Sequence, residues 1–178
     1  MAAKGFIKLL EIAERSRQRT LGLATAGQAA EFWSGVGFTL GGQYFVAPMG
    51  EVAEVLAVPR YTSVPGVKNW MKGLANVRGR LLPIMDLLSF LNRPSALHDH
   101  RRRLIVVDQG DIFSGLVVDE VLGMQHFSVN DYQAQGLGLP ELEPYLQGGF
   151  QRDGRLWSVF LVSRLVEDPQ FLQAAATA

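Results

Sequence analysis

The chain contains no cysteine, which excludes disulfide bonds, a thiolate nucleophile and zinc sites built on thiolates. It also lacks any uninterrupted apolar stretch near the roughly 18 residues that a membrane-spanning helix needs. Seventeen basic and 17 acidic residues balance, so the chain as a whole has no electrostatic preference for nucleic acid or an anionic membrane. Near the N-terminus, Lys8, Glu11 and Glu14 interrupt the apolar residues too early for a secretory signal. We therefore expect a cytoplasmic protein that does not bind nucleic acid.

The motifs of the common enzyme classes are missing as well. There is no Gly-x-Ser-x-Gly elbow and no P-loop, and neither Gly35–Gly37 nor Gly136–Gly138 completes a dinucleotide fingerprint. His98 and His100 would share one side of an extended segment, but no third ligand is near in sequence, which favours a solvated loop over a metal site. The run Arg101–Arg103 is better interpreted as a charged linker end than as a phosphate site, because no aromatic residues alternate with it. We expect neither an enzyme nor a metal nor a cofactor.

What is present indicates a globular protein with a helical extension. Hydrophobic residues make up 48% of the chain and charged residues 19%, enough for a sizeable core. Residues 4–21 carry Phe6, Leu9 and Leu10 at helical spacing, which predicts an amphipathic helix within an extension over residues 1–33. That helix either packs on the body of the protein or docks on a partner or a membrane surface.

From residue 34 onward, short apolar runs separated by glycines are typical of strands, so residues 34–168 predict a mainly β domain. Hairpins are expected over residues 36–47, 76–85 and 146–161. Residues 51–58 suit a helical turn that gives way to a strand, residues 67–72 suggest one helical turn, and residues 135–144 suggest a loop. Asp86 is placed to cap a short helix ending at Leu91. A helix over residues 162–172 must break at Pro169, and residues 169–178 are assigned to a C-terminal tail.

Three short segments recur in the same order in the two halves of the chain. Gly42–Phe45 echoes Gly110–Phe113, Val52–Leu56 echoes Val118–Leu122, and Gly79–Leu81 echoes Gly154–Leu156. One echo arises by chance, but three in order favour two pseudo-symmetric, small five-stranded β-barrel lobes with short helices, over residues 34–92 and 103–167. A crevice between two such lobes is a natural binding groove.

The hairpin around Asn76–Gly79 presents a charged side chain that calls for an explanation. Arg78 on a turn can donate a forked set of hydrogen bonds to a partner, which lysine cannot reproduce. Alternatively, Arg78 forms an intramolecular pair with Asp86 or Glu54 that holds the turn. Pro83, inside the apolar run that follows, indicates an edge strand or a bulge.

Seven segments follow one another in an order that is found in a known family: Phe38–Gly41, Glu51–Val55, Val64–Gly66, Lys72–Gly73, Asn76–Gly79, Pro83–Leu87 and Gly115–Asp119. In this order they resemble the CheW-like coupling proteins of bacterial chemosensory arrays. The resemblance covers about residues 36–167, and the Asn-x-Arg-Gly and Pro-x-x-Asp-Leu segments are its most specific part. It implies a fold of two small β-barrel lobes, in agreement with the internal echo.

The resemblance implies an adaptor that connects the cytoplasmic tip of a chemoreceptor to the regulatory domain of a histidine kinase. That kinase domain has the same fold in this family, so self-association or ring assembly is expected too. The residues that the resemblance places at partner contacts are Val52, Glu54, Gly73, Asn76, Val77, Arg78, Gly79, Pro83, Gly115 and Val118. The N-terminal extension and the basic linker at residues 98–103 resemble the twitching-motility, type IV pilus branch. A detached kinase regulatory domain and a β-barrel module that binds a small molecule remain the alternatives.

Overall fold

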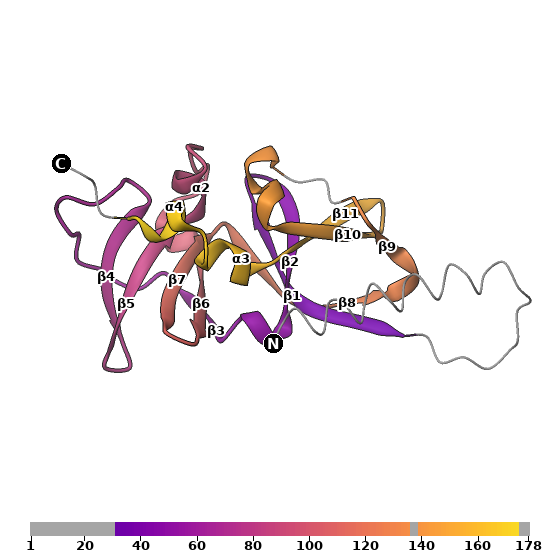
Figure 1. Ribbon diagram of the computed structural model, residues 1–178, viewed down its shortest axis with the longest axis horizontal. Helices are drawn as coiled ribbons and strands as arrows, with labels where there is room; N and C mark the ends of the chain where they lie inside the picture. The colour runs from indigo at the N-terminus through magenta and orange to yellow at the C-terminus, as the bar shows by residue number, and fades with distance from the viewer. Residues whose placement is uncertain (1–30, 136–138, 175–178) are drawn as a thin grey trace, which may run out of the picture.

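The structure, a computed structural model, describes residues 31–135 and 139–174. Its strands form two sheets that lie side by side along the long axis of the molecule (Figure 1). The mainly β class expected from the sequence is therefore confirmed. The helix predicted over residues 4–21 lies outside the described residues.

The described strands are β1 Phe32–Leu40, β2 Gln43–Pro48, β3 Glu54–Ala57, β4 Met71–Val77, β5 Arg80–Asp86, β6 Arg103–Gln109, β7 Ile112–Val118, β8 Glu120–Ser128, β9 Tyr132–Gln133, β10 Leu146–Arg152 and β11 Arg155–Phe160. The helical elements are short: η1 Met49–Glu51, α2 Leu87–Phe90, η2 Asp99–Arg101, η3 Val129–Asp131, η4 Pro140–Tyr145, α3 Val162–Val166 and α4 Pro169–Leu172. The three predicted hairpins are present as β1–β2, β4–β5 and β10–β11.

The two sheets are not the two halves of the chain. The six-stranded sheet has the order β8-β1-β2-β11-β10-β9, and the five-stranded sheet has the order β3-β6-β7-β5-β4. Each sheet thus combines a hairpin from one half, β1–β2 or β6–β7, with strands from the other half. The predicted lobes over residues 34–92 and 103–167 are wrong as structural units, because the chain crosses between the sheets after β2 and again after β7. Each half of the chain therefore supplies its first hairpin, β1–β2 or β6–β7, to the sheet that is otherwise formed by the other half.

In both sheets, the chain that follows one edge strand forms backbone hydrogen bonds with a strand at or next to the opposite edge. In the five-stranded sheet, the chain beyond β3 reaches β4 through paired backbone hydrogen bonds of 2.8 and 2.9 Å between Thr62 and Leu74. In the six-stranded sheet, the chain beyond β8 reaches β10 through β9. The strand that is met has a register shift at a glycine with positive φ in both cases, Gly73 in β4 and Gly148 in β10.

The largest hydrophobic cluster is shared by both sheets. It includes Phe38 and Phe45 of the six-stranded sheet and Ile105 and Leu116 of the five-stranded sheet, together with Phe160. A smaller cluster lies within each sheet, around Phe127 and Trp157 in one and around Leu82 and Val106 in the other. Since the largest buried cluster combines residues of both sheets, we expect the sheets to fold as one unit.

Several local expectations need correction. Pro83 lies in β5, between β4 and β7, and so not on an edge strand. Leu74, opposite Pro83, directs its amide and carbonyl to Thr62, so proline's missing N–H breaks no bond to β4, and the registered pairing with β7 begins only at Ile84. Residues 67–72 form turns and the start of β4 rather than a helical turn.

The C-terminal part of the chain is more ordered than predicted. The loop expected over residues 135–144 contains most of η4, in which Leu142 is fully buried. Pro169 does separate α3 from α4, as predicted. The assignment of residues 169–178 to a tail is wrong for α4, because Phe171 is buried and its ring contacts Phe90 of α2 at 5.3 Å between centroids.

Candidate partner-binding surface

The turn between β4 and β5 has the geometry of a two-residue hairpin loop. Arg78 and Gly79 both have positive φ, 52° and 80°, and Val77 pairs with Arg80 across the turn. Positive φ at both central positions defines a type I′ turn, which suits glycine and strains arginine. Asn76 stabilises the turn, because its Oδ1 accepts a hydrogen bond of 2.9 Å from the Gly79 amide. The sequence therefore places Arg78 at the tip of the β4–β5 hairpin.

Arg78 pairs with Glu54, one of the two intramolecular partners considered from the sequence. Arg78 Nη2 lies 2.7 Å from Glu54 Oε2, and 77% of the Arg78 side chain is exposed against 24% for Glu54. Glu54 begins β3, at one edge of the five-stranded sheet, whereas the hairpin includes β4 at the other edge. The pair therefore joins the two ends of the sheet at the surface, and most of the Arg78 side chain stays accessible to a partner.

A second pair of charges, which sequence reasoning missed, lies beside the first. Arg80 Nη1 donates to Asp108 Oδ2 at 2.6 Å, and the Arg80 guanidinium stacks 3.7 Å from the centre of the Phe113 ring. These residues, with Arg78, Glu54 and Val77, line an open cavity of about 200 Å³. We call this set the Arg78 surface. The alternation of Arg78 and Arg80 was visible in the sequence, but nothing local indicated that Asp108 and Phe113 lie opposite.

The remaining predicted contact residues divide into surface and interior. Asn76, Arg78 and Gly79 are exposed, whereas Val52, Glu54, Val77 and Pro83 are half-buried. Glu54, Val77 and Arg78 line the Arg78 surface, and Asn76 and Gly79 flank them in the same hairpin, whereas Val52 packs against the cluster that the two sheets share.

Gly73, Gly115 and Val118 are buried and are corrected from contact residues to structural ones. A Cβ on Gly73 would collide with the Thr62 carbonyl oxygen, and one on Gly115 would approach Leu104 to 2.9 Å. Val118 is fully buried in the cluster that the two sheets share. The two glycines therefore serve close packing of the backbone, and Val118 serves the core.

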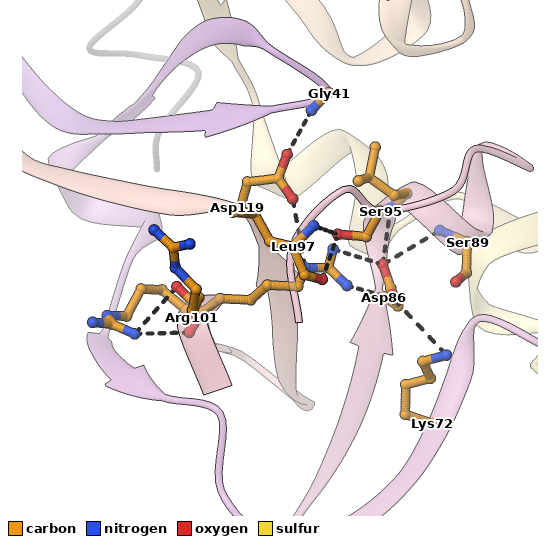
Figure 2. A network of polar contacts seen from close by, with 11 residues as sticks. Gly41, Lys72, Asp86, Ser89, Ser95, Leu97, Arg101 and Asp119 are labelled. Carbon is orange, nitrogen blue, oxygen red and sulfur yellow. Dashed lines mark hydrogen bonds and ion pairs between the residues drawn. The ribbon is translucent and has the colours of Figure 1, made fainter. Parts of the chain in front are cut away.

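A network of buried charges lies between the sheets (Figure 2). Arg102 donates two hydrogen bonds to Asp86, at 2.7 and 3.0 Å, and its Nε lies 3.5 Å from Asp119 Oδ1. The other oxygen of Asp119 accepts from the Gly41 amide at 2.8 Å. Lys72 stands at the periphery, 3.9 Å from Asp86. The side chains of Arg102 and Asp86 are 1% and 5% exposed, so they form a desolvated ion pair.

Asp86 also caps α2, as the sequence predicts. Its Oδ1 accepts from the amides of Leu88 and Ser89 at 3.0 and 3.3 Å. Burial raises the pKa of the Asp86 carboxyl, but the hydrogen bonds and charge of Arg102 outweigh burial, and the net pKa lies below the ordinary aspartate value. Asp86 is therefore held ionised, with its charge divided between a helix N-terminus and a buried guanidinium.

The burial of Arg102 was missed. The run Arg101–Arg103 was interpreted as a charged linker end, which holds for Arg101 and Arg103, since both are exposed. One signal was available: Arg102 lies one residue before an apolar strand, with aspartates at the ends of two other apolar runs. Sequence alone does not say which of three adjacent arginines turns inward.

A second buried carboxylate caps a helix from a distant part of the chain. Glu51 is 1% exposed, and its two oxygens accept from the amide and the hydroxyl of Ser163, at 3.3 and 2.7 Å. Ser163 lies in the first turn of α3, which has no cap of its own from Leu161. Glu51 therefore caps α3 although Ser163 lies 112 residues further along the chain.

The fold and this surface place the chain in a known class of protein. A family model described as CheW-like domain matches residues 34–170, and the chain belongs to that family. A crystal structure of the scaffolding protein TtCheW from Thermoanaerobacter tengcongensis has the same fold, with a TM-score of 0.64 over 73% of this chain and 89% of that one, at 20% identity.

Curated relatives narrow the assignment to one branch. The chain is 49% identical to Protein PilI of Pseudomonas aeruginosa over 174 residues, which cover 96% of both chains. It is 32% identical to Protein FrzA of Myxococcus xanthus, over 71% of this chain and 79% of FrzA. The assignment to the CheW-like family and its PilI-like branch is therefore confirmed. No helix in the described ranges is long and apolar enough to cross a membrane.

Proposed function

We propose that this protein is a non-enzymatic adaptor that couples the cytoplasmic tip of a chemoreceptor to the regulatory domain of a histidine kinase. Its output is control of type IV pilus twitching motility, and it acts in the cytoplasm at membrane-associated receptor arrays. Family membership and the match to PilI support the adaptor role. The observation that carries the proposal is the exposed Arg78, which a strained type I′ turn holds against Glu54 at the surface.

The Arg78 surface has the physical properties of a protein contact. It combines a forked donor, two carboxylates and an aromatic ring around one concavity, and side chains of these kinds recognise a partner helix or strand end. A cavity of about 200 Å³ is small for the roughly 300–1,000 Å³ of small-molecule sites, which disfavours the ligand-binding alternative.

The test is a binding experiment with a receptor cytoplasmic fragment and a kinase regulatory domain, measured separately by calorimetry. Arg78→Glu should weaken at least one of the two interactions by roughly tenfold or more, about 1.4 kcal/mol, because it places a carboxylate where the partner meets a cation. Arg60→Glu is the matched control, since Arg60 is an exposed arginine that follows β3 at the opposite end of that strand. It should bind like the wild type.

A charge exchange separates partner binding from turn stabilisation. Glu54→Arg combined with Arg78→Glu restores an intramolecular pair but reverses the charges that a partner meets. Binding should remain weak in this double variant if Arg78 contacts a partner. Full recovery of binding would show that Arg78 only holds its turn, and a wild-type protein that binds neither partner would refute the adaptor proposal.

A further inference from the structure

The buried network lies where the chain passes from one sheet to the other. Between consecutive strands, the described chain makes this passage twice, after β2 and after β7, and each passage carries a buried carboxylate. Glu51 occupies the first passage and binds Ser163 of α3. Asp119 occupies the second, between β7 and β8, and its two oxygens face Arg102 and the Gly41 amide. The crossings are thus attached by polar contacts as well as by apolar packing.

Arg102 connects this second crossing to the five-stranded sheet. It lies directly before β6, and its two terminal nitrogens bind Asp86 at the end of β5, while its Nε faces Asp119. Asp119 in turn contacts the turn between β1 and β2, in the six-stranded sheet. A continuous chain of contacts therefore runs from α2 and Asp86 through Arg102 and Asp119 to Gly41. Figure 2 shows Asp86, Asp119 and Gly41 along it.

Apolar packing alone would join the sheets but would define their mutual orientation less sharply. Dispersion contacts and burial depend little on direction, whereas Arg102, fixed by its bidentate pair with Asp86, faces Asp119 and favours one orientation of that carboxylate toward the Gly41 amide. Asp86, Arg102 and Asp119 all lie at strand ends of the five-stranded sheet, so the network crosses to the other sheet at the 2.8 Å hydrogen bond from the Gly41 amide to Asp119. Sliding of the sheets would break that bond and leave one oxygen of a largely buried carboxylate without its donor. The network thus penalises small displacements that the shared core would tolerate.

We propose that Arg102 is a positioning residue that sets the mutual orientation of the two sheets, so that partners bound on different sheets are held in one geometry. The inference about orientation rests on the contacts alone. Its consequence for simultaneous binding rests on the proposed adaptor function, and the two are tested separately.

The orientation is measurable because the natural chain has no cysteine. Cysteines in place of Asp111, in the exposed turn between β6 and β7, and Asp153, in the exposed turn between β10 and β11, put one spin label on each sheet. Wild type should give a narrow distance distribution by pulsed electron paramagnetic resonance. Arg102→Met should broaden or shift it, since Asp86 and Asp119 lose their shared partner.

Arg93→Met is the matched control. Arg93, which follows α2, also makes a bidentate pair with a carboxylate, that of Glu141 in η4, at 3.0 and 3.2 Å. Both of these side chains are about 40% exposed, unlike Arg102 and Asp86. Water can solvate the carboxylate that this variant leaves behind, so the distribution should stay narrow. Equal broadening in both variants, or none in a folded Arg102→Met protein, overturns the inference. Should Arg102→Met not fold, Asp119→Asn with the same labels decides in the same way.

The functional consequence is tested by comparing the affinity of the protein for each partner alone with its affinity when both partners bind at once. Arg102→Met should bind the receptor fragment and the kinase domain singly within about threefold of the wild type, but the complex of all three should weaken by about tenfold. A merely destabilising change would lower single and simultaneous binding together, and that result would also overturn the positioning role. If the wild type binds neither partner, the adaptor proposal fails while the distance measurement still decides the orientation.

Discussion

Single residues on the β4–β5 hairpin divide between recognition and architecture. Arg78 accepts a strained backbone conformation and yet remains mostly exposed, although asparagine or glycine would suit its position in the turn better. The equivalent residue in the hairpin between β10 and β11 is Asp153, with φ of 51°, so the turn geometry is repeated while the charge is reversed. The turn geometry is therefore a property of the fold, whereas the arginine is specific to the surface of the β4–β5 hairpin.

Gly73 was predicted to contact a partner, but in the structure it is buried and packs against the backbone of Thr62. We expect Gly73→Ala to lower the free energy of unfolding by more than about 2 kcal/mol, because its Cβ would collide with the Thr62 carbonyl at a positive φ of 154°. Urea denaturation followed by fluorescence measures this. Gly50→Ala, where a Cβ meets no atom within 4 Å, should change stability by less than about 0.5 kcal/mol. Similar losses in both variants would refute the steric explanation.

At the scale of elements, Asp86 links the start of α2 to the interior of the molecule. Its folded-state pKa is depressed, so the stability it supplies is complete above its unfolded pKa and is lost as the pH falls through the lower, folded value. At pH 7, Asp86→Asn should cost about 3–5 kcal/mol, because it leaves Arg102 with only the more distant Asp119.

The pH dependence of that cost provides the check. Since wild-type Asp86 also loses its charge in acid, the difference between wild type and Asp86→Asn should shrink as the pH falls below about 4. Denaturation curves at a series of pH values measure the difference. Asp153→Asn, at a side chain that is 89% exposed, should follow the wild type throughout. A difference that stays constant from neutral to acid pH would mean that the Asp86 charge does not stabilise the fold.

The strand pairing in the structure corrects the register of the internal repeat by one residue. In the sheets, Ile84 pairs with Gly115 and its counterpart Val159 pairs with Val46, which makes Tyr44 the equivalent of Phe113. The sequence echo had matched Phe45 with Phe113, one residue out of register. The structural register agrees with the side chains, because Arg80 stacks on Phe113 and Arg155 stacks on Tyr44. Short strings of glycine and apolar residues locate a repeat but do not define its register.

At the scale of the whole molecule, exchange of hairpins makes the two halves of the chain interdependent. We expect neither fragment 1–97 nor fragment 98–178 to fold alone, since each would lack central strands of the sheet that it begins to form. Far-UV circular dichroism with thermal unfolding should show no cooperative transition for either fragment and a transition for their mixture. A cooperative transition in one isolated half would restore the sequential lobes that the topology excludes.

The sequence by itself determined the features that depend on neighbouring residues. Turns on glycines, the Asn76–Gly79 hairpin, the cap at Asp86 and the break at Pro169 were all predictable, because each follows from the dihedral angles and hydrogen bonds of a few adjacent residues. The family resemblance, carried by those same short segments, was predictable for the same reason.

Only the tertiary structure decided which residues meet across the chain. The pairing of β6–β7 with β3–β5, the burial of Arg102 against Asp86 and Asp119, and the proximity of Arg80 to Asp108 depend on contacts between residues from 16 to more than 30 positions apart. Burial of a charge is decided by the free energy of the whole assembly, which trades desolvation against distant partners. For that reason one arginine of Arg101–Arg103 lies in the core while its neighbours remain in water.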